Sequence, residues 1–279
     1  MSVNYNGLVR ADWPENLAEI QRGLFYGDAL FESIRVSDGR IPLMKFHWER
    51  LSGGLRAMGY KVPSAWSAAF FEIEILRVAW SNARVRLTVW RAPGGLWLPE
   101  NDEPRFLITA KEMETAHFRW MEYGLAIGVC NGVRMPVDSL SCYKTLSAPR
   151  YVAAAQEARN KGWDEGLVRN AYDRISEATS SNLFWFEGES LFTPPLTDGG
   201  VTGTFQKLLL LLRSEAGLPV LEKPATFAVL QRADEMFLTN AIQGIRWVRD
   251  FEGKVLIHHK TRSVYQKVVE RFDLKIPLE

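Results

Sequence analysis

Hydrophobic and polar residues alternate with period two along several short stretches of the chain, and each stretch predicts a half-buried strand. The clearest is RVRLTVW at 84–90, where Val85, Leu87 and Val89 alternate with polar or larger residues. Such alternation puts one set of side chains on a buried face and the other set on the opposite face. Residues 23–44 predict a loop, a strand, a Ser-Asp-Gly turn and a second strand.

A helical period of apolar residues marks the other elements. In KFHWERLSGGLRAMGY, Leu51, Leu55 and Met58 lie near that period, although the Gly53–Gly54 pair weakens the helix. PRYVAAAQEARNKG has proline near its start and glycine at its end, which are typical helix limits. The expected helices cover residues 45–60, 66–80, 149–162, 204–219 and 262–274.

Short strand patterns dominate the second half of the chain. GLAIGVC at 124–130 predicts a buried strand, and five more follow at GLVRN, NLFWFE, SLFTPP, MFLTNA and IRWV. This order favours an α+β fold with a curved, barrel-like sheet over a doubly wound parallel sheet. The charged stretch KEMETAHFRWME breaks the strand pattern. We therefore predict a small N-terminal α/β domain over 1–115, a linker over 116–121 and a larger C-terminal domain over 122–279.

Composition narrows the classes of partner. The chain of 279 residues is 47% hydrophobic with a formal net charge of +1, so neither nucleic acid nor a membrane surface is an expected partner. Its two cysteines, Cys130 and Cys142, are too few for a disulfide framework and fit a reducing compartment. The sequence has no signal peptide pattern, membrane-spanning run or metal-ligand spacing. We expect a cytoplasmic protein without a metal.

Three stretches carry residues suited to chemistry. In CYKTLSAPR, Lys144 lies in a short, nearly uncharged loop, where partial exclusion of water can keep an amine neutral and nucleophilic. In DGGVTGTFQKLLL, the backbone N–H groups of Gly203, Thr204 and Phe205 lie at a helix start and can bind a phosphate; ordinary capping by threonine is the alternative. Arg50, in HWERL, can clamp a phosphate or can pair with an acid.

Glu177 adds a carboxylate. It lies among small residues in RISEATSSNLFWF, where it can face a pocket or be a solvated loop acid. A reactive lysine, an anion cradle, an arginine and a lone carboxylate together are the parts of a pyridoxal phosphate site. The lysine would bond the cofactor's aldehyde, the cradle and Arg50 its phosphate, and Glu177 its pyridine nitrogen.

The order of these stretches resembles the class IV pyridoxal-phosphate aminotransferase family, also called fold type IV. GLFYGDALFESIRV is similar to the family's N-terminal motif, HWERL to its phosphate-binding arginine motif and YKTL to its lysine motif. ISEATSSNLFW followed by FTPPL is the most specific match, and MFLTNAIQGIRWV resembles the last active-site strand. The resemblance covers nearly the whole chain.

The resemblance implies a two-domain enzyme that holds pyridoxal 5'-phosphate between its domains and forms a homodimer. It implies that Lys144 is catalytic, that Tyr26 and Phe31 line the substrate side, and that Arg91 faces the site. The implied cofactor-binding residues are Arg50, Lys144, Glu177, Gly203, Thr204, Phe205 and Asn240. SAPR after the lysine departs from the usual asparagine-containing sequence, which leaves open the group that bonds the cofactor's phenolic oxygen.

Three functions remain open within this resemblance. The Asn240–Ala241 pair and the RAPGGLWLPE loop resemble those of aminodeoxychorismate lyase, which splits aminodeoxychorismate into 4-aminobenzoate and pyruvate for folate synthesis. A branched-chain or D-amino-acid aminotransferase is the alternative, although the Arg-x-His carboxylate trap of typical D-amino-acid aminotransferases is missing. A non-catalytic cofactor-binding protein is the third. Lys144 would move protons in both reactions, so it does not separate the first two.

Overall fold

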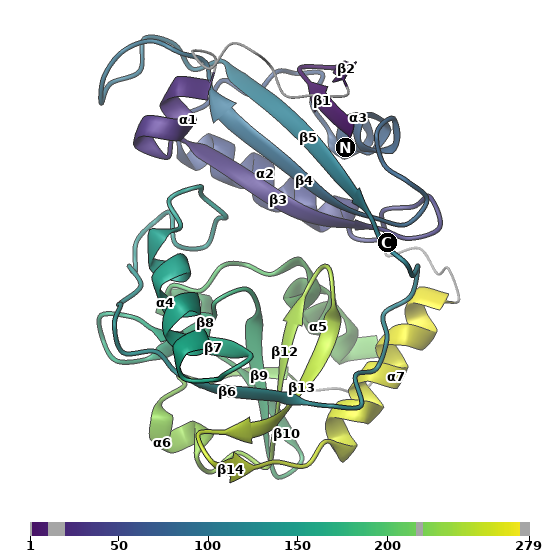
Figure 1. Ribbon diagram of the computed structural model, residues 1–279, viewed down its shortest axis with the longest axis vertical. Coiled ribbons are helices and arrows are strands. Elements are labelled where there is room, and N and C mark those ends of the chain that lie inside the picture. The colour runs from purple at the N-terminus through teal and green to yellow at the C-terminus, as the bar shows by residue number, and fades with distance from the viewer. Residues whose placement is uncertain (1, 11–19, 216–219, 274–279) are drawn as a thin grey trace. The chain divides into compact units, whose positions relative to one another are not determined.

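The computed structural model describes residues 2–10, 20–215 and 220–273 (Figure 1). They fall into two compact units. The first comprises the described chain up to Ala116 together with Tyr143–Ser147, and the second comprises His117–Cys142 and the chain from Ala148 onward. The linear division predicted from the sequence did not include this excursion of five residues, which carries Lys144 into the first unit.

A five-stranded antiparallel sheet, in the order β2-β1-β5-β4-β3, forms the first unit. The alternation predicted for 84–90 is confirmed, because Val85, Leu87 and Val89 are fully buried while Arg84 and Arg86 are exposed. The strands are β1 Ser2–Tyr5, β2 Leu8–Arg10, β3 Ala29–Val36, β4 Ala83–Arg91 and β5 Pro104–Glu112.

Two helices cover one face of this sheet, α2 over Met44–Ala57 and α3 over Ala68–Leu76 (Figure 1). The core that they form with the sheet is aliphatic and aromatic and includes Leu55, Phe71 and Leu87. Both helices predicted for this half are confirmed. The opposite face of the sheet carries Arg84 and Arg86 of β4.

The stretch before β3 differs from its prediction. A short helix α1, Gln21–Tyr26, forms where the sequence predicted a loop, and it ends at Gly27, whose φ of 64° is a left-handed conformation that glycine adopts without strain. The second strand predicted after the Ser-Asp-Gly turn is also wrong. Only an isolated bridge joins Ser37 to Arg40, and the apolar residues that follow lead into α2.

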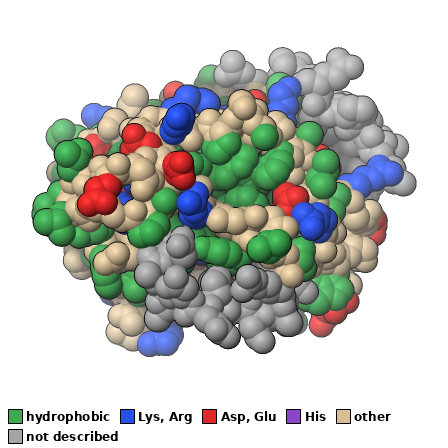
Figure 2. All heavy atoms as spheres, turned by 90° about the horizontal axis from the view of Figure 1, so that it is seen from above, with side chains coloured by type: hydrophobic (Ala, Val, Ile, Leu, Met, Phe, Trp, Pro, Cys, Tyr) green, Lys and Arg blue, Asp and Glu red, His purple; other side chains and the backbone are tan. Residues whose placement is uncertain are grey.

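Exposed apolar side chains gather on the first unit. They belong to α1, with Leu24 and Phe25, and to the loop between β4 and β5, with Leu96, Trp97 and Leu98. Figure 2, which views the molecule from above, shows hydrophobic side chains at its left-hand edge, on the side where Figure 1 draws α1 and this loop. Trp97 is 86% exposed, so this surface has no cover within the described chain.

A nine-stranded mixed sheet forms the second unit, in the order β11-β10-β9-β12-β13-β6-β7-β8, with β14 paired to β13. The sheet curls, and the predicted α+β fold with a barrel-like sheet is confirmed. Its strands are β6 Leu125–Val129, β7 Glu165–Arg169, β8 Ile175–Ala178, β9 Asn182–Glu187, β10 Ser190–Thr193, β11 Val220–Glu222, β12 Glu235–Asn240, β13 Gly244–Phe251 and β14 Lys254–Val255.

Helices pack on this sheet, α4 beside β7 and both α5 and α7 beside β12. The predicted helices at 149–162, 204–219 and 262–274 are confirmed, although residues 216–219 and 274 lie outside the described residues. The helices are α4 Pro149–Asn160, the 3₁₀ turn η2 Leu196–Asp198, α5 Thr204–Glu215, α6 Phe227–Leu230 and α7 His259–Asp273. None of the described helices is long and apolar enough to cross a membrane.

Candidate active site

Lys144 lies beside strand β3 in the first unit. The N–H of Phe31 donates to the Lys144 carbonyl at 2.8 Å, and the N–H of Leu146 donates to the Ala29 carbonyl at 2.9 Å. These two bonds hold the lysine segment along β3. The side chain is half-buried, and its Nζ lies 4.5 Å from the ring centroid of Phe31. An aromatic face beside the amine excludes water on that side, as a reactive lysine requires.

Arg50 is held by a carboxylate that the sequence analysis did not single out. Its Nε and Nη2 donate to Glu32 Oε1 and Oε2 at 2.8 and 2.5 Å, and His47 Nδ1 lies 2.6 Å from Oε2. All three side chains are buried. Burial alone would raise the pKa of Glu32, but the charges and hydrogen bonds of Arg50 and His47 lower it to about 2.

His47 is therefore a neutral donor to an ionised acid. Burial lowers the pKa of His47, the charges of Arg50 and Lys144 lower it further, and Glu32 opposes them. A carboxylate only accepts hydrogen bonds, so the proton of the imidazole lies on Nδ1. The spacing of His47 and Arg50, three residues apart in HWERL, was the available signal, because it puts both side chains on one face of α2.

Arg86 joins Lys144 at the ring of Phe31. Its Cζ lies 3.9 Å from the ring centroid, and it stands directly across the β3–β4 ladder from Ser33. Among the residues that the structure describes, no carboxylate or other polar group bonds to Arg86. A guanidinium at the ring that Lys144 also contacts, with no ion-pair partner among the described residues, is suited to bind a substrate carboxylate. Sequence reasoning missed Arg86, although the alternation along 84–90 places it on the open face.

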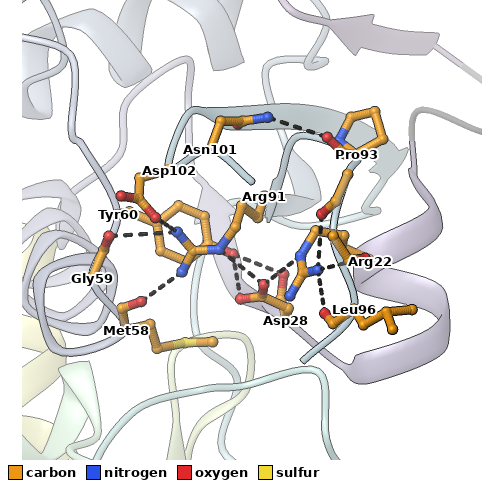
Figure 3. Close-up of polar contacts among 12 residues, drawn as sticks. Arg22, Asp28, Met58, Gly59, Tyr60, Arg91, Pro93, Leu96, Asn101 and Asp102 are labelled. Carbon is orange, nitrogen blue, oxygen red and sulfur yellow. Dashed lines mark hydrogen bonds and ion pairs between the residues drawn. The ribbon is translucent and has the colours of Figure 1, made fainter. Parts of the chain in front are cut away.

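Arg91 is occupied by the protein itself (Figure 3). Its Nε donates to Asp28 Oδ2 at 2.9 Å, its Nη1 to Asp102 Oδ1 at 2.5 Å and its Nη2 to the Met58 carbonyl at 2.6 Å. The guanidinium also lies 4.1 Å over the ring of Tyr60. Arg91 is 3% exposed, so its donors serve folding; the contact with substrate stays a prediction.

Tyr26 lies at the end of α1 and is half-buried. Its ring centroid is 5.3 Å from that of Trp97, and Arg22 Cζ lies 5.0 Å over its ring. Arg22 also donates to the carbonyl of Leu96 at 2.7 Å and pairs with Asp28 at 2.9 Å (Figure 3). Tyr26 is thus placed by the loop between β4 and β5, and its predicted role toward substrate remains open to test.

Glu177 is buried on β8 in the second unit. The hydroxyl of Tyr151 donates to Oε1 at 2.5 Å, and the N–H of Val201 donates to Oε2 at 3.2 Å. Burial raises the pKa of Tyr151, and the charge and hydrogen bond of Glu177 raise it further, so the phenol stays a protonated donor. The sequence analysis did not find Tyr151, because only the tertiary fold joins it to Glu177.

The predicted phosphate loop approaches β8 and β9 closely. A Cβ added at Gly203 would lie 1.8 Å from Asn182 Oδ1, and one at Gly200 would lie 3.0 Å from the Ser176 carbonyl. The amide of Asn182 donates to the Val201 carbonyl at 2.9 Å and fixes the loop. Glycine is required here because the backbone itself packs against the strands.

The start of α5 is capped by a glutamine side chain. The N–H of Gly203 donates to Gln206 Oε1 at 3.2 Å, which is a side-chain cap of the helix. Thr204 and Phe205 are both buried, and the Phe205 ring packs at 5.3 Å against Phe118. Any contact of these two residues with a phosphate would therefore come from the backbone at the helix start.

Thr239 offers a hydroxyl that sequence reasoning missed. Its Oγ1 is buried and has no hydrogen-bond partner within the described chain, and Thr239 lies directly across the β9–β12 ladder from Asn182. Asn240, the next residue, is used inside its turn: Oδ1 accepts from the N–H groups of Ile242 and Gln243 at 3.0 and 2.8 Å. An orphaned donor beside a glycine loop and a buried carboxylate fit a group with a phosphate and a ring nitrogen, as pyridoxal phosphate has.

The fold and these side chains define a fold type IV enzyme scaffold. The family model for amino-transferase class IV matches residues 29–251, and the chain belongs to this enzyme family. The resemblance stated from the motifs is thereby confirmed. Among the described residues, no group of His, Cys, Asp or Glu side chains is arranged to hold a metal.

Relatives within the family divide between two activities. A protein of Methanocaldococcus jannaschii, named provisionally as a branched-chain-amino-acid aminotransferase, is 28% identical over 98% of this chain and 95% of its own. The crystal structure of 4-amino-4-deoxychorismate lyase from Pseudomonas aeruginosa superposes with a TM-score of 0.83 at 27% identity, covering 98% of this chain and all of the lyase. An aminotransferase from Brucella abortus bound to PLP superposes with a TM-score of 0.82 at 21% identity, covering 96% and 99%.

Proposed function

We propose that this protein is a pyridoxal-phosphate-dependent lyase that converts aminodeoxychorismate to 4-aminobenzoate and pyruvate, a reaction of folate synthesis. The proposal rests on the position of Arg86. Its exposed guanidinium lies 3.9 Å from the centroid of the Phe31 ring, and Lys144 contacts the same ring. A charged group at this position favours a carboxylate of the substrate over an aliphatic side chain. The likeness to the Pseudomonas aeruginosa lyase supports the same choice.

The chain's own residues have distinct tasks in this proposal. Arg50, oriented by Glu32 and His47, and the backbone at Thr204 and Phe205 would bind the phosphate. Glu177, held by Tyr151, would keep the ring nitrogen protonated. The cofactor, when bound, supplies an electron sink for charge that develops on the substrate.

Lys144 would remove and return protons as the substrate loses pyruvate. Arg86 would hold a substrate carboxylate while Phe31 shields the amine of Lys144 from water. Aromatisation of the product ring to 4-aminobenzoate makes the free energy of the cleavage favourable. The protein therefore needs only to position the substrate and to remove its proton.

A branched-chain or D-amino-acid aminotransferase is the second candidate. The Methanocaldococcus jannaschii relative favours the branched-chain form, since it spans nearly the whole chain at 28% identity. The half-buried ring of Phe31 can also pack against an aliphatic side chain. In that case Lys144 would move a proton from the α-carbon of the amino acid, and the bound cofactor would supply the acceptor of the amino group.

One experiment separates these candidates. The protein loaded with pyridoxal phosphate is mixed with aminodeoxychorismate, with no keto acid present, and 4-aminobenzoate is measured by its fluorescence. We expect sustained turnover by the wild type and a loss of at least about 1,000-fold in Lys144→Ala. Bleaching of the cofactor's visible band by L- or D-amino acids, without formation of 4-aminobenzoate, would instead establish an aminotransferase. A cofactor-binding protein without catalysis would do neither.

A homodimer and a cytoplasmic location complete the proposal. The exposed apolar side chains of α1 and of the β4–β5 loop, led by Leu96, Trp97 and Leu98, support a second copy as a partner. The two cysteines are unpaired, which fits a reducing compartment. Light scattering should give the mass of two chains, and Trp97→Ser should shift the population toward the monomer; a monomeric wild type would refute the dimer.

A further inference from the structure

Three cations stand side by side across the sheet of the first unit. Arg84 of β4 lies directly opposite Arg35 of β3 on one side and Lys111 of β5 on the other. Like charges at paired positions of adjacent strands destabilise a sheet. Arg35 is buried and donates to the Ser37 hydroxyl at 3.2 Å and the Thr115 carbonyl at 2.8 Å. Arg84 and Lys111 are exposed.

A counter-ion at Arg84 would offset this crowding. Within the part of the chain that the structure describes, no acidic side chain pairs with Arg84. Partial burial lowers the pKa of Arg86, and the positive charge of Arg84 lowers it further, so the two guanidiniums repel each other. Repulsion between these cations lowers the stability of the sheet. Proteins keep such locally unfavourable arrangements at functional sites, where a bound ligand can supply the missing negative charge.

The spacing of the two arginines matches two carboxylates on one small molecule. Arg84 and Arg86 are two residues apart on a strand, so their side chains leave the same face about 7 Å apart. Arg86 is the member beside Phe31 and Lys144. Ser33, opposite Arg86, has a small side chain.

We propose that Arg84 binds the second carboxylate of a dicarboxylate substrate whose first carboxylate is bound by Arg86. This assignment rests on the proposed function, in which Lys144 acts on the substrate's amine side. Arg84 is then a specificity-determining residue. It selects dicarboxylates against amino acids with an apolar side chain, for which a second guanidinium would have no partner.

The test measures binding of two probes by calorimetry to the full chain loaded with pyridoxal phosphate. Chorismate carries both carboxylates and no amine, and benzoate carries one carboxylate. We expect Arg84→Gln to weaken chorismate about ten-fold and to leave benzoate unchanged, since one charge-assisted contact is removed. Arg86→Gln should weaken both probes. Arg56→Gln, which removes an exposed charge at the end of α2 on the other face of the sheet, should weaken neither.

Two results would overturn the assignment. An unchanged chorismate affinity in Arg84→Gln would show that Arg84 binds no carboxylate. An equal loss of affinity for both probes would show a diffuse charge effect instead. Unfolding midpoints of the variants check that each one folds. The proposed lyase reaction is tested separately, and it is refuted if the wild type forms no 4-aminobenzoate. In that case a selective loss of chorismate affinity in Arg84→Gln would still assign a dicarboxylate site to this face.

Discussion

Strand β4 carries Arg91 at its C-terminal end and Arg84 and Arg86 in its first half, and the two ends use arginine in opposite ways. Arg91 is buried and its donors are bonded to Asp28, Asp102 and backbone carbonyls (Figure 3). Arg84 and Arg86 are exposed and form no ion pair in the described chain. Bonds made inside the fold occupy the donors of a guanidinium, whereas an unbonded guanidinium retains all of its donors.

The parity of the positions explains this contrast. Arg84 and Arg86 are even-numbered and leave the face opposite the core, whereas Arg91 is odd-numbered and leaves the core face with Val85, Leu87 and Val89. The resemblance to the family suggested Arg91 as a substrate residue, and that role stays a prediction. The strand's period would have pointed to Arg86.

The largest expected effect follows from the buried end of the strand. Arg91→Met should lower the free energy of unfolding by about 3 kcal/mol, because it empties a buried position and removes one partner of the Asp28 carboxylate, which is only 13% exposed. The remaining pair between Arg22 and Asp28 limits the loss. Urea denaturation measures the change. The matched variant Arg86→Met should stay within about 0.5 kcal/mol of the wild type, and equal losses in the two variants would erase the comparison.

The next effect follows from the open end. Arg86→Gln should lower kcat/KM for the substrate by about 100-fold, since a guanidinium–carboxylate contact contributes about 2–3 kcal/mol to binding of the transition state. Its unfolding free energy should not change. Steady-state kinetics with the loaded enzyme provide the measurement, and Arg86→Lys should recover part of the activity. A variant with normal kinetics would show that the substrate carboxylate binds elsewhere.

The fold could be predicted from the sequence wherever one period dominates a stretch. The alternation along β4 and the apolar stripe of α2 each specify an element and its buried face. The short helix α1 could not be predicted, because its six residues carry little periodicity and its end depends on the conformation of Gly27. The strand expected after Gly39 failed because its apolar residues are equally suited to the entry of a helix.

The residues of the candidate site fall into two groups, those that motifs identify and those that only the tertiary fold brings together. Recognisable motifs contain Lys144, Arg50 and Glu177, so these residues could be singled out from the sequence alone. Their partners depend on the fold: Glu32 meets Arg50 across 18 positions, and Tyr151 meets Glu177 across 26. Thr239 requires the register of two strands, because only the β9–β12 pairing places it opposite Asn182.

The bond from Tyr151 to Glu177 allows the same comparison, of a bonded and an unbonded group, to be made for a carboxylate. Tyr151→Phe should lower kcat about ten-fold, because loss of one buried hydrogen bond, about 1–1.5 kcal/mol, lets Glu177 shift from the position that the ring nitrogen needs. The absorption band of the bound cofactor should also change its pH dependence, which a purely structural role would not cause. Tyr172→Phe, at a tyrosine that is 72% exposed, is the matched control. Identical spectra for both variants would remove Tyr151 from the site.

The smallest effect tests the cost of burying His47 as a neutral donor. Its pKa is lowered in the fold, so below the ordinary value of about 6.5 the unfolded chain binds a proton that the native chain does not. Stability should therefore fall as the pH decreases below about 6.5, by up to about 1.4 kcal/mol per pH unit. Glu32, whose pKa is lowered to about 2, acts in a separate window: its contribution is present above its unfolded pKa, near 4.5, and is lost as the pH falls toward 2.

Unfolding free energies of the wild type and of His47→Gln between pH 7 and 5 isolate the histidine. Glutamine keeps an N–H donor for Glu32 but does not titrate, so the difference between the two curves should narrow or reverse in favour of the variant as the pH falls from 6.5 to 5. Parallel curves would mean that His47 takes up its proton at the same pH in the fold as in the unfolded chain. Below that pH, Arg50 would share Glu32 with a second full charge, and the trio would carry a net positive charge, as the cations on the open face of β4 do.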